Sequence, residues 1–573
     1  MRPVRFSAPL RRGACAALVF GAWTAGCASG PVTLRGAPVA APAAPALPAT
    51  PAPETLGWVR TRQVLRTIDR LEVGSAATAF AAMGIEASLP DPDRPFVIAL
   101  AAPGGAEGGG DASRVPALAY APIAPDSTLA TLMTGFSPGG VAPLAGGTAF
   151  PLLGASTVDG PNRALVEALA GAPLTTDAEI AVSAPTLLRA FGDTVRGALR
   201  DVPGLLLAST GRRNALTPEA SSALGAALVA WVDAQHSILL TAAVDETTLA
   251  ATLVSRAPGV SSGPAEGTTL PPYARFVPPG ALRAEFRWDA AREAQAPGVP
   301  ERLVDAVFAD QPAARSALLA DLRTFTRASA GGALSFGPGG PALVRGVLVL
   351  QSDAAPQMYT AVLDLLRRIG EPAITLALWR RMIGLTVQIT EGARESEGWP
   401  VTRVALSVRP GPGFGGGEKV LPFSRLFARP MAIELVRAGD TLVATLDEAP
   451  DVLDGTLAAL VAGEGRHPEL AARAAAPEGG DLYVDLDLAA GIADLSERLP
   501  AARLRRLPAL PADVGPVTFF GVGGIPDESP RQLRLSLPRA LYTALRGAAR
   551  SLDTGLRTPS PPGPRASPRA GPT

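Results

Sequence analysis

Ser261 is the residue of this sequence whose surroundings most resemble those of a catalytic nucleophile. It lies in the pentapeptide 259–263, which has the G-x-S-x-G spacing. That spacing supports nucleophilic catalysis only where a buried strand precedes the serine and a helix follows it. Pro258 and Pro264 flank the pentapeptide instead, so we expect an ordinary loop here.

A glycine-rich stretch at 411–416 has the G-x-G-x-x-G spacing of phosphate-binding loops. It follows an expected strand, Val401–Val408, but residues 417–422 end in a proline and do not open a helix. Phosphate binding in such loops depends on the N–H groups of a helix N-terminus. Lys419 also lacks the serine or threonine that follows the lysine of a P-loop, so the sequence predicts a flexible loop.

Three aspartates, Asp481, Asp485 and Asp487, alternate with the aliphatic residues of 482–486 along an expected strand. Paired carboxyl groups can perform general acid and base catalysis. The alternation also fits a strand whose aspartate face is solvated, with Asp487 capping the next helix. We adopt this structural interpretation.

Metal ligands are scarce. His236 and His467 are the only histidines, and neither lies in an HExxH pattern. Asp91 and Asp93 lie in a turn without the spacing of a calcium loop. We therefore expect no metal, no cofactor and no catalytic residue that the sequence alone can identify.

The composition narrows the class of protein. The chain has 573 residues, of which 47% are hydrophobic and 18% charged, and its formal net charge is zero. A surface for nucleic acid would require a basic excess, so no nucleic-acid partner is expected. The only cysteines are Cys15 and Cys27.

The N-terminus has the pattern of an export signal. Arginines at positions 2, 5, 11 and 12 precede the apolar stretch Gly13–Trp23, which is shorter than the roughly 20 residues that span a bilayer. We expect residues 1–26 to be removed, which also removes Cys15 and leaves a mature chain that cannot form an internal disulfide.

The junction Thr24-Ala25-Gly26-Cys27 resembles the lipobox of bacterial lipoproteins. The resemblance implies that Cys27 carries lipid, palmitate included, and becomes the new N-terminus. Thr24 departs from the usual leucine, which leaves cleavage by the ordinary signal peptidase as the alternative. Ala28 stands where an aspartate would retain such a protein in the inner membrane, so the resemblance implies the outer membrane, on its periplasmic or its surface side.

Composition also suggests the domain boundaries. We expect a Pro/Ala-rich tether at 27–55, a first lobe at 56–257, a linker at 258–273, a second lobe at 274–553 and a disordered Pro/Ser/Arg-rich tail at 554–573. With its lipobox and its tether, the chain resembles the large uncharacterised envelope lipoproteins of high-GC Gram-negative bacteria, for which no activity is established.

Within the lobes, strand pairs alternate with amphipathic helices. The expected pairs, each leading into a helix, are Ala333–Phe336 with Ala342–Leu350, Met431–Leu446, Val517–Val522 with Arg531–Leu537, Ala226–Val232 with Ser237–Val244, and Phe96–Leu100 with Ala117–Ile123. The helix after Ser237–Val244 is expected to contain Leu249 and Leu253. The faces marked by Val362 and Leu365, and by Leu545, are expected to pack onto the preceding hairpins.

Elsewhere a strand leads directly into a helix cap, at Ala178–Val182 before Ser183, Arg283–Trp288 before Asp289, and Leu482–Leu486 before Asp487. Together these patterns predict an α+β fold of strand, helix, hairpin, helix units used two to four times, with helices covering antiparallel or mixed sheets.

Two functions remain open from the sequence. The first is a membrane-anchored, non-catalytic binding or scaffolding module, whose apolar or peptide ligand would lie against aliphatic side chains. The alternative is a periplasmic or surface hydrolase whose site only the fold assembles. The shortage of histidine, lysine and cysteine favours the first.

Overall fold

A computed structural model gives the fold. It describes the following residues: 55–62, 94–101, 117–127, 130–131, 134, 140–144, 146–152, 161–174, 176–209, 222, 225–226, 229, 232–233, 235–245, 247–256, 272–287, 304, 308, 311–328, 330–338, 344–372, 374–375, 383–410, 430–474, 482–496, 510, 514–522 and 531–545. The expected signal peptide and tail lie outside these residues, as do all of the expected tether except Thr55 and nearly all of the expected linker.

Strands dominate the described residues. The strands are β1 Thr55–Arg62, β2 Pro95–Ala101, β3 Ala117–Ala121, β4 Ala142–Leu144, β5 Gly147–Leu152, β6 Ala178–Ser183, β7 Ser237–Val244, β8 Thr248–Arg256, β9 Leu282–Arg287, β10 Gly331–Gly337, β11 Arg345–Gln351, β12 Ile383–Ser396, β13 Trp399–Pro410, β14 Met431–Ala438, β15 Thr441–Leu446, β16 Leu482–Leu486, β17 Val517–Val522 and β18 Arg531–Pro538. The helices are α5 Pro161–Gly171, α6 Ala184–Ser209, α10 Pro312–Ala328, α11 Ala355–Ile369, α14 Pro450–Ala462, α15 Ala471–Ala474, α16 Leu488–Ser496 and the 3₁₀ helix η2 Tyr273–Phe276.

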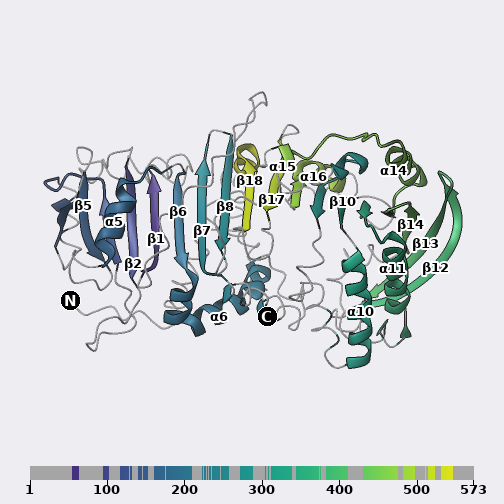
Figure 1. Ribbon diagram of the computed structural model, residues 1–573. Coiled ribbons are helices and arrows are strands. Elements are labelled where there is room, and N and C mark those ends of the chain that lie inside the picture. Colours follow the sequence, from purple (N-terminus) through teal and green to yellow (C-terminus); the bar gives the residue numbers. More distant parts are fainter. Residues whose placement is uncertain are drawn as a thin grey trace, which may run out of the picture.

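All 18 strands belong to one sheet, and every pairing between them is antiparallel (Figure 1). The pairings give the spatial order β4-β5-β3-β2-β1-β6-β7-β8-β18-β17-β16-β9-β10-β11-β15-β14-β13-β12. The C-terminal strands, yellow-green to yellow in Figure 1, therefore lie between β8 and β9. The fold is α+β, as expected, and the sheet continues across the expected division between the lobes because β8 pairs with β18.

In the half of the sheet formed by β9–β18, helices cover both faces. Val347 and Val349 pack on one face in a core that includes Leu453 and Leu457 of α14, and we call this the α14 face. Leu348 and Leu350 point to the opposite face, where they pack with Met358 of α11, and we call this the α11 face. Burial on both faces explains why β11 is a continuous apolar run and not an alternation of apolar and polar residues.

In the half of the sheet formed by β1–β8, helix α5 covers the face that α14 covers in the other half. Val166 and Leu169 of α5 pack with Trp58, Val97 and Tyr120 of the strands below. Tyr120 is the cross-strand partner of Val97, and Val97 is the partner of Arg60, so these three side chains lie on one side of the sheet. From Arg60, successive cross-strand partners on neighbouring strands lead to Val349 of β11, which therefore lies on the same side. The two cores, one under α5 and one under α14, therefore lie on one side of one sheet.

Local sequence explains where these elements end. Pro450 occupies the first turn of α14, and Gly463 ends the helix with φ +67°, where its N–H returns to the carbonyl of Leu460. Glu397 and Gly398 form the two-residue turn between β12 and β13, and both have positive φ, as tight hairpins with the right-handed twist require.

Most of the expected elements occur. Val362 packs on the preceding hairpin as expected, but Leu365 packs against Leu318 of α10. Three further corrections follow. The hairpins that precede α11 and α14 are confirmed, but Thr248–Arg256 is the strand β8 and not a helix. Ala226, Val229 and Val232 of the expected strand 226–232 are helical. Leu545 is 36% exposed, whereas Leu541, one turn earlier, is fully buried, so Leu541 provides the packing expected of Leu545.

Candidate functional site

The middle of the α11 face is made of apolar residues on adjacent strands. Leu253 of β8 pairs with Leu240 of β7 and with Leu533 of β18. Leu535 of β18 pairs with Ala251 and with Phe519 of β17, and Phe519 pairs with Val484 of β16. We call this surface the apolar face, and its members are Leu240, Ala242, Ala251, Leu253, Leu533, Leu535, Phe519, Leu482 and Val484.

The apolar face is only partly covered. Leu533 and Leu535 are 40% and 38% exposed, although β18 lies in the interior of the sheet. The other members are half-buried. Arg534, between the two leucines, points to the opposite face and is itself half-buried, which reverses the usual arrangement of apolar residues inside and charged residues outside. Contiguous exposed apolar surface of this kind marks sites of interaction.

On the other side of the sheet, the α14 face carries two clusters of buried polar groups. Arg60 and Glu179 are cross-strand partners and form an ion pair with a 2.7 Å separation between Nη2 and Oε2. Their side chains are 5% and 2% exposed. Arg60 also donates to the carbonyl of Leu169 at 3.3 Å and to that of Ala172 at 3.1 Å. The pair therefore fixes the C-terminal end of α5 to the sheet.

A second buried cluster lies farther along the same face. Glu285 accepts hydrogen bonds from the N–H of Ala274 at 2.6 Å and from Nη1 of Arg473 at 2.7 Å. Arg283 donates to the carbonyls of Ala274 at 2.6 Å and Pro468 at 3.0 Å. These bonds hold η2 and the segment around α15 against β9, so the cluster has a structural role.

Asp485 is buried and not solvated, contrary to the expectation from its alternation with leucines. Its carboxylate accepts from the N–H groups of Ala471 at 2.6 Å and Ala472 at 2.8 Å, which satisfies the start of α15. Burial raises the pKa of Asp485, and these two hydrogen bonds oppose the increase. Asp487 caps α16, as expected, by accepting from the N–H of Ala490 at 2.8 Å.

The two histidines lie apart from each other in the fold. His236 directly precedes β7, and its carbonyl accepts the N–H of Ala184. His467 is half-buried beside α15, and its N–H donates to the carbonyl of Arg275 at 3.0 Å. Burial, followed by the nearby charges of Arg283 and Arg466, lowers the pKa of the His467 imidazole from its ordinary value of 6.5.

This lowered pKa predicts a pH dependence of stability. The unfolded chain binds a proton at His467 more tightly than the folded chain, so the contribution of this group is fully present above pH 6.5 and is lost as the pH falls toward the folded pKa. We expect the free energy of unfolding, measured with urea, to fall less between pH 7.5 and 5.5 in His467→Gln than in the wild type. Parallel pH profiles would contradict this assignment.

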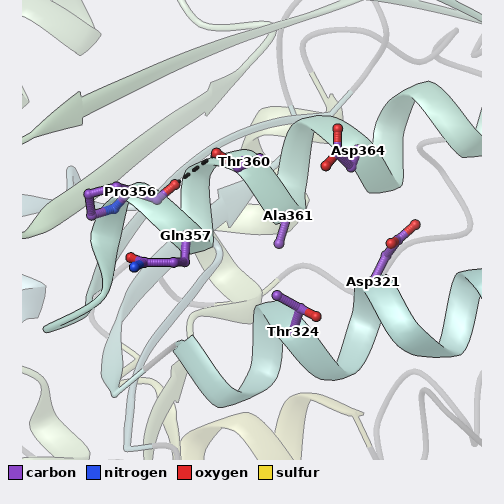
Figure 2. A pocket seen from close by; sticks show the side chains of 7 residues that line it. All are labelled: Asp321, Thr324, Pro356, Gln357, Thr360, Ala361 and Asp364. Atoms are coloured by element: carbon purple, nitrogen blue, oxygen red, sulfur yellow. Dashed lines mark hydrogen bonds between the residues drawn. The ribbon is translucent and has the colours of Figure 1, made fainter.

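A hollow of about 420 Å³ lies between α10 and α11 (Figure 2). Asp321 and Thr324 line it from α10, whereas Gln357, Thr360 and Asp364 line it from α11. Both carboxylates are already paired, Asp321 with Arg368 and Asp364 with Arg367. The hollow is therefore a polar surface depression whose charges are balanced.

Several residues that the sequence singled out lie outside the described residues, namely Cys27, Ser261, the glycine-rich stretch 411–416 with Lys419, Asp91, Asp93 and Asp481. Among the residues that are described, no three histidine, cysteine, aspartate or glutamate side chains gather as metal ligands would.

Sequence reasoning missed the buried pair and the apolar face. Arg60 and Glu179 are separated by 119 positions, and only the pairing of β1 with β6 brings them together. A charged residue inside an otherwise apolar strand, such as Glu179 in Ala178–Ser183, was the available signal.

No family model, curated protein or solved structure matches this chain. Among the helices that the structure describes, none combines the length and the apolar character needed to cross a membrane.

Proposed function

We propose that this protein is a membrane-anchored envelope lipoprotein that binds an apolar ligand, the hydrocarbon chain of a lipid, on its apolar face. The observation that carries the proposal is the exposure of Leu533 and Leu535 on an interior strand, within an uncharged row of cross-strand partners. The function is binding or scaffolding without catalysis.

The chemistry of the apolar face favours a hydrocarbon chain over an extended peptide. The backbone groups of its strands are engaged in sheet pairing, so the face offers aliphatic side chains and few polar partners. An extended peptide laid on it would leave N–H and C=O groups unsatisfied, which is costly, whereas a hydrocarbon chain has no such groups. Covering the exposed two fifths of Leu533 and Leu535 contributes on the order of 1 kcal/mol each.

The same proposal includes a repeated architecture. The order β3-β2-β1-β6-β7-β8 in the first half matches β11-β10-β9-β16-β17-β18 in the second. The buried charges occur at the matching strand pairs, β1 with β6 and β9 with β16. We propose that the two halves of the sheet are copies of each other, joined where β8 pairs with β18. The apolar face then lies at this junction.

Anchoring through Cys27 rests on the lipobox-like junction and predicts a simple result. Cys27→Ser should move the protein from the membrane fraction to the soluble fraction, because the lipid-bearing thiol is absent. The measurement is fractionation of cells followed by immunoblotting, with Cys15→Ser as the matched control that should stay in the membrane fraction. Retention of Cys27→Ser after a high-salt wash would place the anchor elsewhere.

Binding is tested with the form that lacks residues 1–27, purified from cells and examined by native mass spectrometry. We expect co-purified lipid, and we expect Leu533→Gln/Leu535→Gln to lower its occupancy about tenfold or more, because roughly 2 kcal/mol of contact is lost. The same preparations are offered esterase, peptidase and glycosidase substrates. Turnover abolished by His467→Gln or Asp485→Asn would overturn the proposal in favour of a hydrolase.

A further inference from the structure

We infer that the outer edge of β12 pairs with the same strand of a second copy of this chain and so continues the antiparallel sheet across a two-fold axis. β12 is the last strand at one end of the sheet (Figure 1). It pairs with β13 on its inner side, and none of the other described strands pairs with it.

The two end strands of the sheet differ in a way that singles out β12. At the opposite end, β4 has only 3 residues and contains Pro143, which lacks an N–H group. β12 has 14 residues, and its stretch 385–390, Leu-Thr-Val-Gln-Ile-Thr, contains neither a charge nor a proline. Edge strands are ordinarily protected by short length, proline, charge or a β-bulge. β4 is protected by its length and its proline, whereas the register irregularity of β12 begins only after Thr390, so the stretch 385–390 is not protected.

Packing against α11 fixes one face of β12. Val387 and Ile389 lie against Leu363 of α11 in a common core. On the opposite side of the strand, Thr386 and Gln388 are exposed. Because the core fixes one face of the stretch 385–390, which pairs with β13 in unbroken register, pairing along its outer edge does not require this stretch to reorganise.

A second copy complements this edge. In an antiparallel pair centred on Gln388, Thr386 lies opposite Thr390 of the partner subunit, which is a favourable cross-strand pair. The paired stretch 386–390 carries no charge in either copy, so no like charges face each other there; the register of β12 becomes irregular only beyond it, between Thr390 and Arg394. Glu391 is moreover already paired with Arg367 of its own chain.

The test uses the detergent-solubilised full chain and sedimentation velocity. We expect a dimer for the wild type, and an association weakened roughly fivefold or more in Gln388→Lys and in Gln388→Glu, because each places like charges across the two-fold axis. An equimolar mixture of the two variants should restore the dimer, since lysine then faces glutamate. Gln357→Lys, an exposed glutamine of α11 that receives the same charge, should remain dimeric.

Unchanged thermal unfolding of both Gln388 variants would establish that loss of the dimer is not loss of the fold. A monomeric wild type, including one that carries a different protein at this edge, would overturn the inference. Dimers of both variants that are as stable as the wild type would overturn it too, because the contact would then lie elsewhere.

Discussion

Glu179→Ala is expected to lower the free energy of unfolding by about 3–5 kcal/mol. The substitution leaves Arg60, whose side chain is 5% exposed, as a buried cation without its counter-ion. It also loosens the hold of Arg60 on the carbonyls at the end of α5. Urea denaturation followed by tryptophan fluorescence measures the effect, since Trp58 lies 5.7 Å from the Arg60 guanidinium.

Two control variants distinguish the effect of breaking the buried ion pair from the effect of removing any charged residue. Glu167→Ala removes the partner of Arg163 from an exposed i,i+4 pair on α5, and we expect a change of about 0.5 kcal/mol or less. Replacing both members, in Arg60→Met/Glu179→Leu, should recover much of the stability lost in the single variant, because no charge is then buried alone. Equal losses in Glu179→Ala and Glu167→Ala would contradict this account of the buried pair.

Leu457→Ala is expected to destabilise the second half by about 2–5 kcal/mol. Leu457 of α14 is fully buried in the core that joins α14 to β11 and β15. Val461, one turn later on the same helix, is 66% exposed, so Val461→Ala should change the stability by less than about 0.5 kcal/mol. The comparison uses the same denaturation experiment, and similar unfolding midpoints for the two variants would show that α14 does not pack as described.

Local patterns predicted part of this fold. The hairpin β14–β15 is recognisable because Gly439, at φ +62°, supplies the turn between two β-rich runs. The helix α11 is recognisable from its apolar stripe, of which Met358 is fully buried. In both places the turn, the propensity and the periodicity favour the same structure.

The spacing of the leucines in β8 fits both a helix and a strand. Leu249 and Leu253 are four positions apart, which places them on one face of a helix but also, as an even spacing, on one face of a strand. The structure resolves this in favour of the strand, because β8 pairs with β7 on one side and with the distant β18 on the other. Sequence periodicity contains no information about that second, long-range partner.

The prediction of which face of β16 is buried was wrong for a related reason. Along β16, Leu482 and Val484 alternate with Tyr483 and Asp485, and apolarity alone assigns the first pair to the interior. In the structure Tyr483 and Asp485 are buried, because η2 and α15 cover their side, whereas the leucine side joins the apolar face. The elements that cover a strand are set by tertiary packing, so neither Asp485 nor the apolar face was predictable from the strand itself.

The most direct test of the central claim is photolabelling of the anchored protein in intact membranes by a fatty acid with a diazirine at its hydrocarbon end. If the apolar face binds hydrocarbon chains, mass spectrometry should find the label on peptides covering β17 and β18, and Leu533→Gln/Leu535→Gln should lower this labelling about tenfold or more. Label confined to α10 and α11, or labelling of β17 and β18 that both substitutions leave unchanged, would contradict the account.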